Sequence, residues 1–78
     1  MRGDNTVDKK RIGNMLRQMR GNASQAYTAE QIGITKSSLN MYERGERTPR
    51  DDVKILIASY FGKSVQDIFF GNDSTIGA

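Results

Sequence analysis

The amino-acid sequence predicts a small all-α domain of five helices. Apolar residues recur at spacings of three and four, capping residues and glycines bracket those stretches, and no stretch alternates as a strand would. A chain of 78 residues can build one modest core. We therefore expect one domain over residues 8–70, between a flexible N-terminus at 1–7 and a flexible C-terminal tail at 71–78.

The first helix is expected to begin at Asp8 and to end before Gly21. Its apolar face follows the i, i+3, i+4, i+7 pattern and consists of Ile12, Met15, Leu16 and Met19. Gly21 suits the left-handed conformation that often follows a helix. Most of the basic residues of this segment lie off the apolar face.

Two short helices should follow. Ser24 is a candidate N-cap for a helix over 25–32, and Gly33 ends it. Thr35 is a candidate N-cap for a helix over 36–43, and we expect Ile32, Ile34 and Leu39 to form the core between the two. Two helices joined by a short glycine-bearing turn are typical of a helix-turn-helix, in which the start of the second helix meets base edges in the major groove.

The last two helices are also marked by their first residues. Thr48 is the expected cap of the fourth, with Pro49 at its first position and two aspartates in its first turn. Its apolar face consists of Val53, Leu56, Ile57, Tyr60 and Phe61. Gly62 ends this helix, and Ser64 caps a short fifth helix whose face is Val65, Ile68 and Phe69.

Composition excludes several classes of function. The chain has no cysteine and no histidine, so disulfides, a Cys/His zinc site and a histidine general base are excluded. We expect no enzyme activity, cofactor, metal or small-molecule ligand. We also expect no membrane anchor, since the longest apolar stretch, residues 55–58, is far shorter than the ~20 residues that span a bilayer.

The net charge of +3 is unevenly distributed. Residues 1–20 carry six Lys or Arg against two Asp, whereas residues 51–78 carry two Lys against four Asp. This asymmetry favours an anionic partner on one face. The alternative is an ordinary solvated basic surface, and charge alone does not separate the two.

The central segment resembles the Cro/phage-repressor (XRE) family of helix-turn-helix proteins. The resemblance rests on Ser24-Gln25, Ala29, Gly33-Ile34-Thr35, Leu39 and Tyr42-Glu43-Arg44-Gly45. It continues through Arg47-Thr48-Pro49, Ile57-Ala58, Phe61-Gly62, Ser64-Val65 and Ile68-Phe69, and so covers about residues 10–71. Two departures stand out: Thr28 replaces the usual Leu, and the connection at residues 21–23 is about two residues short.

The resemblance implies a lambda-repressor-like fold and a set of DNA contacts. Lys36 and Ser37 match positions that touch base edges, and Met41 matches a further groove-facing position. Contacts to the DNA backbone, or contacts of uncertain kind, are expected from Ser24, Gln25, Thr35, Ser38, Asn40, Arg44, Arg47 and Arg50. The alternative for each is an exposed polar side chain without a DNA contact, or core packing in the case of Met41.

The resemblance also implies a structural ion pair and a dimer. Glu43 is expected to pair with Arg20, which is the matching residue if the short connection is treated as a deletion. The terminal helices carry more apolar residues than they can hide, so some should form a two-fold contact. The candidates are Ile55, Tyr60, Ile68, Phe69 and Phe70, and the alternative for Ile68 and Phe69 is core packing.

These observations predict a sequence-specific regulator of transcription that occupies a near-palindromic double-stranded DNA operator as a homodimer. It would be a Cro-like or repressor-type protein of a bacterium, phage or mobile element, acting in the cytoplasm at the nucleoid. Activation in place of repression stays open. The rivals are an antitoxin-like protein that contacts a partner through the tail 71–78, a small enzyme or metal-binding module, and a helical domain that has lost DNA binding.

Overall fold

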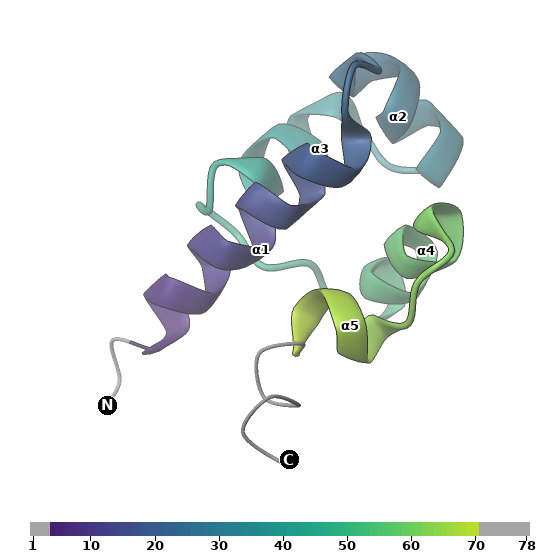
Figure 1. The fold of residues 1–78 in the computed structure, drawn as a ribbon. Coiled ribbons are helices and arrows are strands. Elements are labelled where there is room, and N and C mark those ends of the chain that lie inside the picture. The colour runs from purple at the N-terminus through teal and green to yellow at the C-terminus, as the bar shows by residue number, and fades with distance from the viewer. Residues whose placement is uncertain (1–3, 71–78) are drawn as a thin grey trace.

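The computed structural model describes residues 4–70, and these form five α-helices and no strand. The helices are α1 (Asp4–Arg20), α2 (Gln25–Ile32), α3 (Lys36–Glu43), α4 (Asp51–Phe61) and α5 (Val65–Phe69). In Figure 1, α1 runs alongside α3, with α2 beside one end of this pair and α4 and α5 on the other side of α1. The five-helix, all-α prediction is confirmed.

The helix caps follow the sequence prediction at most ends. The hydroxyls of Ser24, Thr35 and Ser64 each accept a hydrogen bond from the backbone N–H three residues later. Gly33 and Gly62 end α2 and α4 in the left-handed region, with φ of 99° and 70°. The local sequence therefore sets these helix boundaries.

Two predicted helix starts are wrong. α1 begins at Asp4, four residues before the predicted start, so residues 4–7 belong to the first helix. α4 begins at Asp51 with Arg50 as its N-cap, and not with Pro49 in first position. Pro49 is buried and Arg50 has an extended backbone, so packing of the connecting segment delays the turn into α4. The predicted flexible tail at 71–78 lies outside the described residues.

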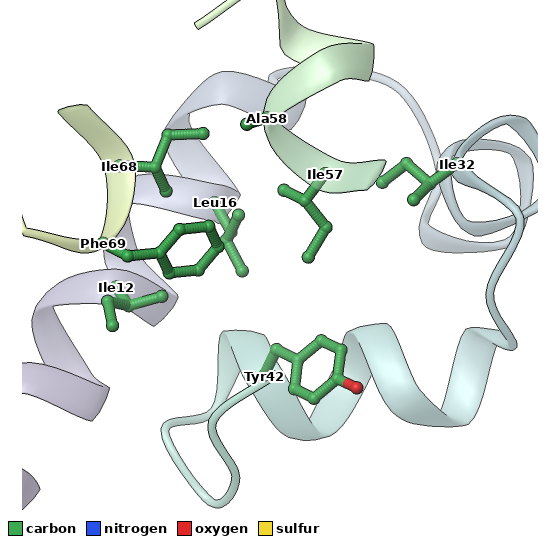
Figure 2. Close-up of a cluster of buried hydrophobic side chains, with 8 residues drawn as sticks. All are labelled: Ile12, Leu16, Ile32, Tyr42, Ile57, Ala58, Ile68 and Phe69. Atoms are coloured by element: carbon green, nitrogen blue, oxygen red, sulfur yellow. The ribbon is translucent and has the colours of Figure 1, made fainter. Parts of the chain in front are cut away.

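The core draws on all five helices (Figure 2). Its buried members are Ile12, Leu16, Ile32, Tyr42, Ile57, Ala58, Ile68 and Phe69. Full burial of one such large side chain contributes about 1.5–3 kcal/mol. The hydrophobic prediction for α1 and for the α2–α3 unit is confirmed, since Ile12, Leu16 and Leu39 are buried and Met15, Met19 and Ile34 pack partly buried against the core.

The apolar face of α4 differs from the predicted one. Ile57 and Ala58 are buried, while Leu56 and Tyr60 are exposed. The ammonium of Lys54 lies 5.6 and 5.1 Å from the ring centroids of Phe69 and Phe70. Because α5 covers the side of α4 that carries Lys54 and Ala58, the helix turns Leu56 and Tyr60 toward solvent.

Helices α1 and α3 cross at very short range. A Cβ atom placed on Gly13 would lie 2.4 Å from the carbonyl oxygen of Glu43 and 2.8 Å from that of Tyr42. Gly13 is therefore the residue that allows α1 to lie directly on the last turn of α3. This contact fixes the position of α3 relative to the rest of the domain.

Candidate nucleic-acid interface

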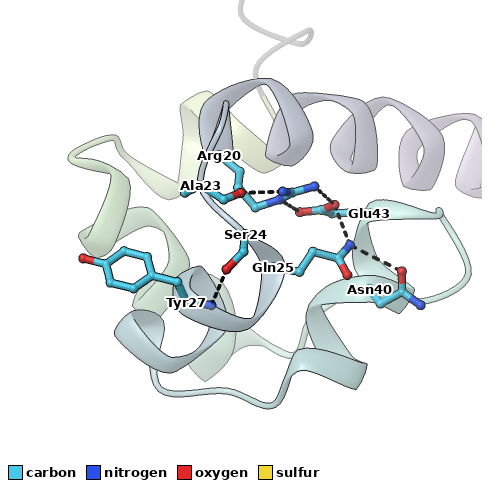
Figure 3. Close-up of polar contacts among 7 residues, drawn as sticks. All are labelled: Arg20, Ala23, Ser24, Gln25, Tyr27, Asn40 and Glu43. Carbon is cyan, nitrogen blue, oxygen red and sulfur yellow. Dashed lines mark hydrogen bonds and ion pairs between the residues drawn. The ribbon is translucent and has the colours of Figure 1, made fainter.

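A polar network between α1, α2 and α3 joins the three helices (Figure 3). Arg20 at the end of α1 donates from Nε to Oε2 of Glu43 at 2.6 Å and from Nη2 to Oε1 at 2.8 Å. Arg20 also donates from Nη1 to the carbonyl of Ala23 at 2.7 Å. These are the two residues for which the sequence predicts an ion pair, and the pair is present.

Glu43 is only 4% exposed, and its carboxylate has a third donor. Nε2 of Gln25 donates to Oε1 of Glu43 at 2.9 Å and to Oδ1 of Asn40 at 3.3 Å. The hydrogen bond to Glu43 raises the pKa of Arg20 above its already high ordinary value, which outweighs the opposing effect of burial. Arg20 therefore stays charged at every physiological pH, and the buried carboxylate always has its counter-ion.

The starts of α2 and α3 lie next to each other, beside this network. Gln25, Lys36, Ser37 and Asn40 line an open depression of about 310 Å³. Lys36 and Ser37 are exposed. Four of the predicted contact residues are thus brought to one place, at the positive ends of two helix dipoles.

The structure gives several other predicted residues a structural role. The hydroxyl of Ser24 accepts from the N–H of Tyr27 at 3.0 Å, so it caps α2. The hydroxyl of Thr35 accepts from the N–H of Ser38 and donates to the hydroxyl of Ser38, both at 3.0 Å. The first two amides of each helix are left without intrahelical partners, and these are the amides that a phosphate can accept from.

The predicted arginines fall into two separate places. Arg47 and Arg50 line a groove of about 260 Å³ between α3 and α4, together with Ser38 and Tyr42. Arg44 lies on the other side of α3, facing α1. Met41 is half-buried and lines none of the three depressions described for this part of the chain.

Sequence reasoning missed the α1 side of this surface. Lys10, Asn14 and Arg17 line a cleft of about 280 Å³ with Glu43 and Arg44. Their i, i+4, i+7 spacing is the available signal, because it places all three on one helix face. This spacing alone did not predict the cleft, because only the packing of α1 on α3 brings that helix face beside Arg44.

A family model described as helix-turn-helix matches residues 15–68, which cover α2 and α3 and most of the chain. The chain belongs to the Cro/repressor-type (XRE) helix-turn-helix family. No curated protein and no solved structure matches the chain significantly.

Membership of the helix-turn-helix family gives α3 the place of the DNA-reading helix and α2 that of its support. The family is one of DNA-binding regulators. Among the described residues, no group of three or more carboxylates forms a candidate metal site. None of the helices in the described part of the chain is long and apolar enough to cross a bilayer.

Ile68 and Phe69 were candidates for dimer contacts, and the structure places both in the core, which was the alternative for them. Both are buried in the core of the same chain, at 0% and 3% exposure, because α5 packs its apolar face onto α1 and α4. Ile55, Tyr60 and Phe70 remain exposed, and Leu56 joins them. Four exposed apolar side chains, called the apolar patch, therefore lie on α4 and directly after α5.

Proposed function

We propose that the protein is a sequence-specific, double-stranded DNA-binding transcriptional regulator that represses by occupying an operator as a homodimer. The observation that carries this proposal is the joint position of Gln25, Lys36, Ser37 and Asn40 at the starts of α2 and α3. Such a surface lets α3 enter a major groove while the start of α2 meets a phosphate. A regulator of this kind would work in the cytoplasm, at the nucleoid.

Each side chain has a defined task in this proposal. Lys36 donates to guanine O6 and N7, Ser37 pairs with a base edge, and Met41 packs against a thymine methyl. Arg44, Arg47 and Arg50 grip phosphates on either side of α3. The network of Arg20, Gln25 and Glu43 holds α3 in place. The side chains proposed to contact bases are therefore carried by a helix with a fixed position in the domain.

The exposed patch of Ile55, Leu56, Tyr60 and Phe70 supports dimerisation. Its residues are apolar, lie on α4 and directly after α5, and are not among the residues proposed to contact DNA. A two-fold contact through this patch would place two copies of α3 about 34 Å apart on a near-palindrome. Repression then follows from occupancy, since the bound dimer blocks polymerase or a competing regulator.

The test is selection of bound duplexes from a random DNA pool by the purified protein at ~150 mM salt. We expect a near-palindromic consensus with half-sites about one helical turn apart. Lys36→Ala and Ser37→Ala should each lose the consensus at one or two positions, at a cost of about 1–3 kcal/mol for each base contact. Lys63→Gln, which removes an exposed charge after α4, is the matched control and should keep the consensus.

A pool that returns no consensus would overturn the proposal. The antitoxin-like alternative would then predict that the protein elutes from gel filtration with a partner protein. The tail 71–78, to which that alternative assigns the contact, lies outside the described residues. The apolar patch on α4 would be the surface to test in its place.

A further inference from the structure

The cleft between α1 and the end of α3 gathers three cations in one place. It is lined by Lys10, Asn14 and Arg17 from α1 and by Glu43 and Arg44 from the end of α3. Lys10, Asn14, Arg17 and Arg44 are exposed. We propose that this cleft is a second anion site, which holds one DNA backbone phosphate beyond the bases read by α3. This inference rests on the proposed function.

Two close contacts build the cleft. Gly13 brings the middle of α1 onto the carbonyls of Tyr42 and Glu43. At Gly45, where φ is +75°, a Cβ would lie 3.3 Å from both Cα and Cγ of Lys10. The cationic face of α1 is therefore held against the turn that carries Arg44. The early start of α1 at Asp4 matters here, because it places Lys10 well inside the helix and not at a fraying end.

The two carboxylates near the cleft do not cancel its charge. Both oxygens of Glu43 accept hydrogen bonds, from Arg20 and from Gln25. The negative charge of Glu43 is therefore compensated by Arg20, which does not line the cleft. Nη2 of Arg44 pairs with Oε2 of Glu46 at 3.0 Å, and both side chains are about half exposed. An exposed pair of this kind is weak, and a guanidinium has five donors, so Arg44 can bind a phosphate oxygen.

The chemistry of the cleft suits one phosphate. Lys10 supplies an ammonium and Arg17 and Arg44 supply guanidinium groups, while the amide of Asn14 adds a neutral donor. Phosphate oxygens accept from all of these groups. A carboxylate ligand would meet the same donors, but the proposed partner is a phosphodiester chain that already contacts the neighbouring surface.

Position along α3 indicates which phosphate is held. Arg44 follows Lys36 by eight residues, which is about 12 Å of helix rise. This is close to the ~12 Å width of the major groove. With the start of α3 at the base edges, its end and the adjacent cleft lie at a phosphate that borders the groove.

The experiment compares Lys10→Gln and Arg17→Gln with the matched control Lys63→Gln in binding to the selected operator and to random duplex at several salt concentrations. Each variant removes one exposed charge, and the control lies after α4 and is not among the residues that line the cleft. If one phosphate contact is lost, the slope of log K against log salt becomes shallower by about 0.9. We expect this change for both cleft variants, on both DNAs, and an unchanged consensus. We expect no change for the control.

A second measurement locates the phosphate. Operators that carry one neutral methylphosphonate, moved along the backbone, should reveal a position that weakens the wild type but not Arg17→Gln. A cleft variant that behaves like Lys63→Gln, while the wild type still selects an operator, would overturn this inference and leave the proposed function standing. If the wild type selects no operator, both the proposed function and this inference are contradicted.

The source of the anion is tested with inorganic phosphate. Titrating it into the DNA-free protein while following the amide resonances of α1 and of residues 43–46 reports any binding in the cleft. We expect weak binding that operator DNA displaces. Tight binding of free phosphate, with no change in the salt slope for Arg17→Gln, would assign the cleft to a free anion and overturn the DNA assignment.

Discussion

The α2–α3 end of the domain and the α4–α5 end hold their helices in different ways. At the first end a charged group is buried: Glu43 is 4% exposed and accepts from Arg20 and Gln25. At the second end the helices pack through apolar side chains, and Ile55, at 60% exposure, is left at the surface. The comparison teaches that a small domain can fix one helix with a buried ion pair while, at its other end, apolar packing leaves several apolar side chains exposed.

The largest expected effect is at the polar end. Arg20→Ala leaves the buried carboxylate of Glu43 without its counter-ion and should lower the free energy of unfolding by about 3–5 kcal/mol. The control is Arg50→Ala at the exposed pair with Asp52, where the distance is 3.6 Å and the loss should stay below about 1 kcal/mol. Urea unfolding followed by circular dichroism measures both.

If both arginine variants lower the free energy of unfolding by the same small amount, the buried pair contributes no more to stability than the exposed pair. Replacing both partners of the buried pair, Arg20→Met with Glu43→Leu, provides a further check. This double variant removes the unpaired charge and should recover most of the stability lost in Arg20→Ala.

The next effect is at the apolar end and concerns binding. Ile55→Lys changes an exposed side chain, so stability should stay within about 0.5 kcal/mol of the wild type. If the patch joins two copies, operator affinity should fall about 100-fold, because the second half-site is no longer bound at a high effective concentration. Gln31→Lys adds the same charge on the exposed side of α2 and serves as the control. Operator affinity and dimer formation on DNA that match the control would contradict the proposed interface.

The smallest effect is a gain in stability. Thr28 is 1% exposed, and its hydroxyl has no hydrogen-bond partner among the described residues. Thr28→Val keeps the shape and removes the unsatisfied group, so the free energy of unfolding should rise by about 1 kcal/mol. Thermal unfolding provides the measurement. A loss of stability in this variant would mean that the hydroxyl has a partner, such as an internal water.

Much of the fold could be predicted from local sequence. The caps at Ser24, Thr35 and Ser64 and the left-handed glycines at 33 and 62 act within a few residues, so the boundaries of α2, α3 and α5 follow from neighbouring residues. The starts of α1 and α4 were predicted wrongly. The N-terminal residues lack apolar spacing to mark a helix, and the start of α4 depends on the burial of Pro49.

The residues of the candidate site also fall into those that could be predicted from the sequence and those that could not. The Arg20–Glu43 pair could be predicted from the family resemblance and is present. The resemblance also indicated Lys36 and Ser37, which lie together at the start of α3, and their contact with DNA stays a prediction. Lys10 and Arg17 could not be predicted, because they meet Arg44 only through the contacts of Gly13 and Gly45. The exclusion of Ile68 and Phe69 from the surface likewise depends on how α5 packs.

The sequence by itself determined the all-α class and the helix-turn-helix, because short-range capping and periodicity act between near neighbours. Its resemblance to the Cro/phage-repressor family, and not capping or periodicity, indicated the family and the residues of interest at the start of α3. The tertiary structure decided which face of α4 is buried, which apolar residues remain free, and where the cations of α1 meet Arg44. These outcomes depend on helix–helix packing at distances that no local pattern encodes. The close approach of α1 and α3 at Gly13 is the contact that makes the cationic cleft.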